Sequence, residues 1–268
     1  MGMLELHVEG IALWAPHLPG WERARAILRG EAAAPAEPAP RPSPALLAPT
    51  ERRRAPDTVA VALEVAASAC ASAGREPRTL ASVFASTYGD LAVSDAVCAQ
   101  LAKAPLETSP TKFHHSIHNA AAGYWAIATG CAEPYTALTA HQHTFGVGLL
   151  TAAVHALSAD TPVLYVAYDI EARGPLATMA KSRGMLGAAL VLATHASSRA
   201  RMRLALTVEE ETECVATRAR AENAALVAGN AMADSLALFE ALAEERAREL
   251  VATLAGAKVV RLALAPPG

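Results

Sequence analysis

The chain has 268 residues, of which 53% are hydrophobic and 18% charged, and its formal net charge is −3. A chain of this length and apolar content buries a substantial core in one domain, or in one domain with an appendage, which excludes a disordered protein. No stripe of Lys and Arg provides the clustered cations that nucleic acid demands, so a nucleic-acid partner is not expected.

The hydrophobic pattern predicts strands that alternate with helices along most of the chain. The predicted elements up to the middle of the chain are a strand over Leu4–Trp14, a Pro- and Ala-rich loop over about residues 32–49, a helix capped by Asp57 or Thr58 and ended by Gly74, a strand over Leu80–Ser86, and a helix from Tyr88-Gly89-Asp90 to about Leu101. Those that follow are a helix over Asn119–Ala128, a strand over Tyr135–Ala140, a helix from about Phe145 to Ser158, and strands over Pro162–Asp169 and Met185–Thr194. This order favours an α/β fold with a mostly parallel sheet covered on both faces.

The last part of the chain departs from that alternation. From Arg203 onward we predict a strand over Leu204–Val208, a helical stretch rich in Glu and Ala, a helix over Asp234–Leu254, and a strand over Lys258–Leu264. The helix over Asp234–Leu254 would dock its apolar face onto the sheet.

Cysteine usage and the apolar runs bear on location. Cys70, Cys98, Cys131 and Cys214 are far apart and form no CxxC pair, and no apolar segment follows a basic one at the N-terminus. We therefore expect a cytoplasmic protein with reduced thiols. The apolar runs are interrupted well short of the roughly 20 residues that a membrane span needs, so no span is expected.

The most informative motif lies where the predicted strand ending at Ala140 turns into the helix containing Phe145. Such a turn displays one side chain at its tip, and the helix N-terminus below it favours a thiolate or an oxyanion. The tip reads His141-Gln142-His143 and contains no Ser, Cys or Asp.

Three runs of residues resemble the β-ketoacyl synthase-like N-terminal domain family. They are Tyr88–Asp90, Ser109–Gly130 with its Ser-Pro-Thr, His-Asn and Ala-Gly-Tyr-Trp blocks, and Thr136–Ala140. More narrowly, the chain resembles the chain-length-factor-like proteins found beside type II ketosynthases in aryl polyene and related polyketide pathways. The resemblance covers roughly residues 4–195.

The resemblance implies a thiolase-like fold, in which two similar α/β halves normally stack around the active site. Here it implies one complete half, residues 1–199, followed by a short β-α-α-β extension, residues 200–268. A full second half would supply two catalytic histidines, but the sequence has no His after His195. Two of the three parts of the usual condensing chemistry are therefore missing.

The resemblance also places the family's nucleophilic cysteine at His141 or at Gln142, depending on how the run before it is matched. Neither residue is an acyl acceptor, so we expect no condensing activity from this subunit by itself. Gln at that place resembles chain-length factors and decarboxylating synthase domains, where an amide can mimic an acylated cysteine.

The implied function is a catalytically incomplete subunit that pairs with an active β-ketoacyl-ACP synthase, works with an acyl carrier protein and shapes the tunnel in which the acyl chain grows. In the family, subunits join edge to edge through the strand that is here Tyr135–Thr139. The expected tunnel residues at the elbow are His141, Gln142, His143 and Phe145, and the expected loop near the site or interface contains Phe113, His114, His115, Ser116, His118 and Asn119. Shrinking Phe145 to Ala or Gly should then change product length.

Two other classes of function remain open. The histidine clusters could serve a stand-alone thioesterase or acyltransferase, or ligate zinc in a metal hydrolase, although no Asp, Glu or Cys stands at ligand spacing beside either cluster. The chain could also be a homodimeric module that binds an acyl carrier. We expect no cofactor and no metal. When the chain is alone, a homodimer is an alternative to the heterodimer with the ketosynthase.

Overall fold

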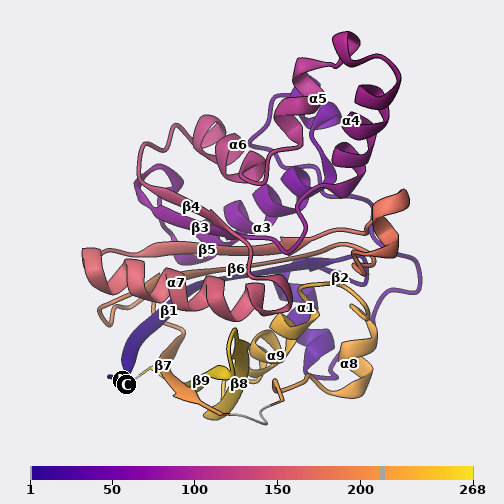
Figure 1. The fold of residues 1–268 in the computed structure, drawn as a ribbon. Helices are drawn as coiled ribbons and strands as arrows, with labels where there is room; N and C mark the ends of the chain where they lie inside the picture. The colour runs from indigo at the N-terminus through magenta and orange to yellow at the C-terminus, as the bar shows by residue number, and fades with distance from the viewer. Residues whose placement is uncertain (1, 212–214, 268) are drawn as a thin grey trace.

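The computed structural model describes residues 2–211 and 215–267. Cys214, and part of the Glu- and Ala-rich stretch predicted to be helical, lie outside these residues. Within the described residues, nine strands form one sheet in the order β4-β3-β5-β6-β1-β7-β9-β8, with β2 paired to β1 (Figure 1). The strands are β1 Leu4–Ala15, β2 Leu18–Pro19, β3 Ala81–Ala85, β4 Tyr135–Leu138, β5 Val163–Asp169, β6 Leu186–Ala193, β7 Met202–Glu210, β8 Arg248–Leu254 and β9 Lys258–Ala265.

The sheet is mixed, so the prediction of a mostly parallel sheet was wrong. Among the described strands, the parallel pairs are β3 with β4 and β3 with β5. All the other pairs are antiparallel. β6 runs antiparallel to β5, and β1 then runs antiparallel to both β6 and β7. A run of alternating elements does not reveal strand direction, because that is set by which face and edge each connection returns to.

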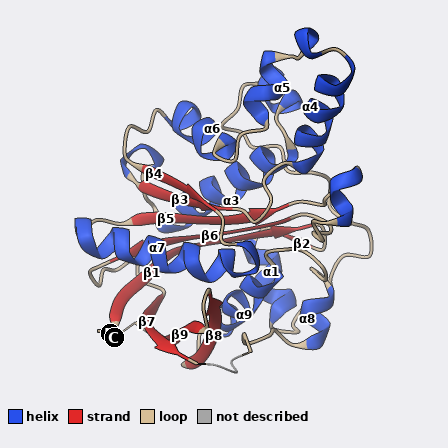
Figure 2. Cartoon of the chain, in the orientation of Figure 1, coloured by secondary structure: helices blue, strands red, loops and turns tan. Residues whose placement is uncertain are grey.

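Helices cover both faces of the sheet, as predicted (Figure 2). The helices are α1 Trp21–Leu28, α2 Pro49–Arg54, α3 Asp57–Ala73, α4 Leu91–Lys103, α5 Pro110–His115, α6 Ala120–Thr129, α7 Thr144–Ala159, α8 Ala221–Ala225 and α9 Leu236–Glu244. On one face α3 and α6 bury Val61 and Trp125. On the other face α7, α1 and α9 bury Leu149, Leu28 and Phe239.

Two glycines allow helices to approach the sheet closely. A Cβ at Gly10 of β1 would lie 2.2 Å from the carbonyl oxygen of Ala69 in α3, and a Cβ at Gly148 of α7 would lie 2.8 Å from the ring of Tyr165 in β5. A side chain at either position would push its helix off the sheet.

The C-terminal part corrects a second prediction. The helix predicted over Asp234–Leu254 is α9 followed by strand β8, and the two are separated by Glu245 in the left-handed conformation with φ 54°. Leu250, Ala252 and Leu254 alternate inward, and β8 pairs with β9 along its whole length. Pairing with a strand later in the chain thus overrode the helical pattern.

Helix α4 follows the loop after β3. Together α4 and α5 project away from the body of the molecule (Figure 1). α4 buries only Val97, and α5 exposes Phe113. None of the described helices is long and apolar enough to cross a membrane.

Candidate functional site

The elbow between β4 and α7 is a tight turn held by one buried hydroxyl. His141–His143 form a single 3-10 turn, and His141 has φ 53°, a left-handed conformation that strains a residue with a Cβ. The Thr144 hydroxyl donates to the carbonyl oxygen of His141 at 2.6 Å and accepts from the N–H of Ala140 at 3.0 Å. This turn presents His141 and Gln142 to solvent.

The other two predicted elbow residues face the body of the protein. His143 is half-buried, and its Nδ1 lies 2.9 Å from Oγ1 of Thr253 in β8. Phe145 is 5% exposed and packs against Tyr165, with ring centroids 5.9 Å apart. The cavity beside them has a volume of about 10 Å³, room for about one water molecule. A cavity of this volume is too small for an acyl chain.

One carboxyl group shares that small cavity with His143. Burial raises the pKa of Asp234, while Arg218 and His143 act to lower it. The closeness of Asp234, His143 and Thr253 ties the elbow to the C-terminal part of the chain and leaves no room for a substrate beside them.

The predicted loop over residues 113–119 begins as helix α5 and continues as a turn into α6. The nitrogen Nε2 of His115 lies 2.8 Å from the Tyr124 hydroxyl, and Nε2 of His118 lies 2.8 Å from the carbonyl oxygen of Ser86. Burial, with His114 nearby, lowers the pKa of His115, whereas Asp90 acts to raise it.

The histidines of the two clusters contact separate groups. His115 contacts the Tyr124 hydroxyl, His118 the carbonyl oxygen of Ser86, and His143 the Thr253 hydroxyl. No three His, Cys, Asp or Glu side chains gather as metal ligands in the part of the chain that the structure describes. Nothing in this geometry favours a zinc hydrolase over the other functions.

The predicted loop instead forms one wall of an apolar groove of about 700 Å³. The groove is bounded by the segment before α2, by α5, by α6 and by the start of β4. Its lining includes Leu46, Leu47, His114, Ile117, Asn119, Gly123, Tyr124, Ile127 and Tyr135. Burial and the carboxylate of Glu51 raise the pKa of Tyr124, whose hydroxyl is neutral in this wall.

The groove lies beside β4, since Tyr135 of this strand lines it. β4 is an edge of the sheet, because among the described strands it is hydrogen-bonded to β3 alone. Ile127 is 82% exposed and Tyr135 41% exposed at this end of the sheet. The sequence placed His114, Asn119 and the strand at the site, whereas Gly123 and Ile127 were noted only as part of the family-like run Ser109–Gly130, because an Ala-rich helix gives no sign of a groove.

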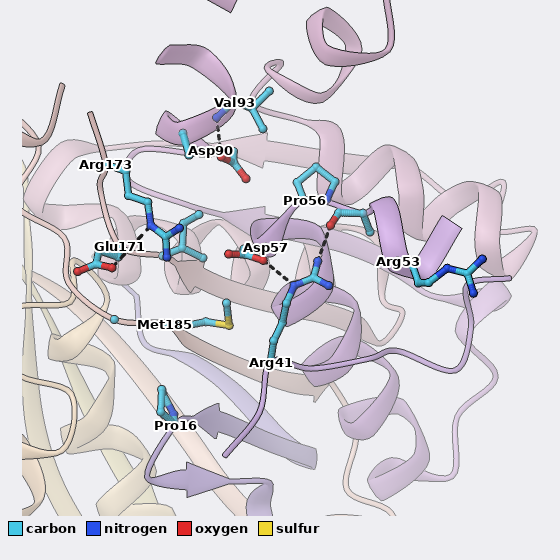
Figure 3. Close-up of a pocket in the computed structure, with 14 residues that line it drawn as sticks. Pro16, Arg41, Arg53, Pro56, Asp57, Asp90, Val93, Glu171, Arg173 and Met185 are labelled. Carbon is cyan, nitrogen blue, oxygen red and sulfur yellow. Dashed lines mark hydrogen bonds and ion pairs between the residues drawn. The ribbon is translucent and has the colours of Figure 1, made fainter. Parts of the chain in front are cut away.

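A second cleft, of about 570 Å³, is lined by charged residues (Figure 3). Arg41 bonds Asp57 at 2.5 Å and also donates to the carbonyl oxygen of Ala55, and Arg173 lies 3.7 Å from Glu171. With Arg53 and Asp90, three arginines face three carboxylates, so the cleft has no excess charge with which to select an ion.

A buried carboxylate behind the elbow was missed by sequence reasoning. Asp169 ends β5, is fully buried and accepts hydrogen bonds from the Ser86 hydroxyl at 2.9 Å and from the N–H groups of Thr87 and Tyr88 at 2.8 and 3.2 Å. Burial raises the pKa of Asp169 to about 6, against these hydrogen bonds. Only the fold brings it to Ser86, so no local motif marks it.

Comparison with known families decides the ancestry of this arrangement. The family described as β-ketoacyl synthase, N-terminal domain, matches residues 21–254. The chain belongs to this β-ketoacyl synthase family. No curated protein matches it in sequence.

Solved structures of ketosynthases share its thiolase-like fold. A chain of the ketosynthase ApeO in complex with its chain length factor ApeC, from Xenorhabdus doucetiae, has a TM-score of 0.73 at 19% identity, over 97% of this chain and 99% of that one. A chain of AntDE:AntF, a type II PKS acyl-carrier protein in complex with its ketosynthase, has a TM-score of 0.71 at 11% identity, over 99% and 100%. The PfaC keto synthase-chain length factor has a TM-score of 0.63 at 10% identity, over 100% of this chain and 43% of that one. At these identities the similarity establishes the fold.

Proposed function

We propose that this chain is a non-condensing, chain-length-factor-type subunit, which pairs with an active β-ketoacyl-ACP synthase and forms one wall of the cavity in which the acyl chain grows. The observation that carries the proposal is an elbow built like a nucleophile elbow whose tip carries no nucleophile. Residues 1–199 act as the ketosynthase-like half and residues 200–268 as the short extension that closes it.

The strain at the elbow supports His141, rather than Gln142, as the position of the family's cysteine. A nucleophile elbow holds its reactive residue on a strained strand-to-helix turn, and His141 is the residue with positive φ in this turn. An imidazole has no thiol with which to form an acyl thioester, so in this proposal the acyl chain is carried by the partner's cysteine.

The edge of the sheet supports the pairing. In the parallel ladder, Leu138 accepts from the N–H of Ser86 and Pro134 from the N–H of Ser82, so the backbone groups of Tyr135 and Ala137 point away from β3. An edge with free backbone groups is a template for another strand. The partner's strand would continue the sheet there, as in the family.

The groove beside this edge supports a role in holding an apolar chain. A partner seated on β4 would cover the open side of the groove and turn it into a closed cavity. Its walls are mostly apolar, which suits a long acyl chain with few oxygen atoms, and the polar groups among them are Glu51, His114, Asn119, Tyr124 and Tyr135. Chain length would depend on the groove more than on Phe145, which packs into the core.

The neighbours' names support the assignment further. One similar structure contains a ketosynthase with its chain length factor, and another contains an acyl-carrier protein. We infer an acyl carrier protein as a second partner, a role in polyketide, aryl polyene or fatty-acid-like synthesis, and a cytoplasmic location in keeping with its dispersed thiols.

The first test is co-expression with the ketosynthase encoded nearest to this chain. Joint purification as a heterodimer, with elongation of malonyl-thioester by the pair and none by this chain alone, is the expected result. A homodimer with no affinity for the ketosynthase, or turnover by this chain alone, would refute the proposal.

Product length then tests the groove. Gly123 lies in α6, and a Cβ added to it would meet no atom within 4 Å, so Gly123→Leu fills the groove and raises helix propensity. We expect the pair to make shorter products. Val154→Leu, on the exposed side of α7, is the matched control and should leave product length unchanged.

A further inference from the structure

The loop of residues 86–89, between β3 and α4, is hydrogen-bonded to the buried carboxylate of Asp169. Asp169 accepts from the Ser86 hydroxyl and from two consecutive backbone N–H groups, those of Thr87 and Tyr88. The Ser86 hydroxyl oxygen in turn accepts from the N–H of Gly89 at 2.9 Å. One buried side chain thus determines the course of residues 86–89.

The carbonyl oxygens of the same loop contact both the elbow and the groove wall. The carbonyl oxygen of Thr87 accepts from the Thr139 hydroxyl at 3.0 Å, two residues before His141 of the elbow. The carbonyl oxygen of Ser86 bonds the ring of His118, which sits between Ile117 and Asn119 of the groove wall. The elbow and the groove wall are therefore attached to one loop.

A neutral side chain of the same size would not hold the loop in this way. An ionised carboxylate offers acceptors on both oxygens, whereas an amide or a protonated carboxyl has a donor in place of one of them. That donor would face an N–H or O–H group that also donates, and the loop would have to move to relieve the contact.

We propose that Asp169 is a positioning residue that sets the elbow and the groove wall together through the loop of residues 86–89. The loop geometry stands on the contacts alone, and only its effect on products rests on the proposed function.

The ionisation of Asp169 should therefore matter near neutral pH, because burial raises its pKa to about 6. Its backbone oxygen also accepts from Asn230 at 3.2 Å, which links it to the C-terminal part. The titratable or charged groups nearest to it on the packed elements are Tyr168, Tyr88, Asp90, His118 and, through Asn230, Arg183.

The test compares Asp169→Asn with Asp160→Asn in the full chain. Asp160 is an exposed carboxylate at the far end of α7, bonded to Thr194 and His195, and serves as the matched control. Hydrogen exchange at the amides of Thr87 and Tyr88, and the NMR chemical shifts of these amides, report the loop directly. In wild type we expect a step in the chemical shifts of these two amides near pH 6, where Asp169 ionises.

In Asp169→Asn we expect that step to vanish and the two amides to exchange about tenfold to a hundredfold faster, since each loses a bond to a charged acceptor. Asp160→Asn should change neither. Unchanged exchange and an unchanged step in the amide shifts of Asp169→Asn would overturn the proposal.

If Asp169→Asn does not fold, Ser86→Ala removes one donor and keeps the carboxylate. A smaller change in the exchange and shifts of the same amides supports the proposal, and no change overturns it. With the ketosynthase partner present, Asp169→Asn should also broaden product length and remove its dependence on pH between about 5 and 7, the range around the raised pKa. A loop that responds while products do not would refute the chain-length role and leave the positioning role standing.

Discussion

The two edges of the sheet differ in how their backbone groups are satisfied. At β8 the N–H of Val251 donates to the Thr217 hydroxyl and its carbonyl oxygen accepts from the N–H of Thr217, both at 2.9 Å. At β4 the outward groups of Tyr135 and Ala137 face no strand among the described residues. The chain covers one edge by itself, whereas the other edge keeps outward backbone groups on which the proposed pairing depends.

The largest effect should come from Phe145, which lies on the side of the closed edge. Phe145→Ala removes a ring packed between Tyr165 and the cavity bounded by Val251 and Ala252, so the free energy of unfolding should fall by about 3–5 kcal/mol. Val154→Ala, on the exposed side of the same helix, should change it by less than about 0.5 kcal/mol. Urea titration measures both. A small loss at Phe145 would mean that it lines open space and would restore it as a tunnel residue.

The next effect concerns Asp169, behind the open edge. Its pKa is raised by burial to about 6, so the folded chain binds a proton that the unfolded chain has released, and stability is lost as pH rises through about 4 to 6. The wild type should lose on the order of 3 kcal/mol relative to Asp169→Asn between about pH 4 and pH 7. Unfolding free energies of both proteins across this range give the difference. A difference that is constant with pH would contradict the raised pKa.

Blocking the open edge should abolish pairing and spare the fold. Ala137→Pro removes an N–H that points away from β3, so we expect affinity for the ketosynthase to fall on the order of 100-fold, or about 2.7 kcal/mol. Ala137→Val keeps the N–H and should pair normally. Co-purification and circular dichroism test this together, and an unaffected complex would exclude β4 as the joining edge.

The smallest effect is expected at the closed edge. Thr217→Ala removes the hydroxyl that accepts from Val251 and should cost about 1 kcal/mol, with no effect on pairing. Thr178→Ala, which loses only a local bond to Pro175 in an exposed turn, is the control. Weaker pairing in Thr217→Ala would show that the two edges do not act separately.

Much of the local structure could be read from the sequence. The strands at the start of the chain and around Leu164 follow from their apolar runs, and the turn at residues 141–143 lies where it was predicted. The long helix ends at Gly74 as predicted, but the prediction of an N-cap at Asp57 or Thr58 was wrong, because the N-cap is Pro56 and no side chain caps the helix. The short helices α1, α2 and α5 were missed, because each has six to eight residues and too few turns to show a period.

The sequence alone determined that the tip of the turn between β4 and α7 reads His141-Gln142-His143 and contains no Ser, Cys or Asp, since that depends only on which residues stand there. The tertiary structure decided the rest. It turned residues 248–254 into a strand by pairing them with β9, sent Phe145 into the core, and brought Asp169 to Ser86 and Thr87. Strand pairing and burial join residues far apart in the chain, and neither period nor propensity carries that information.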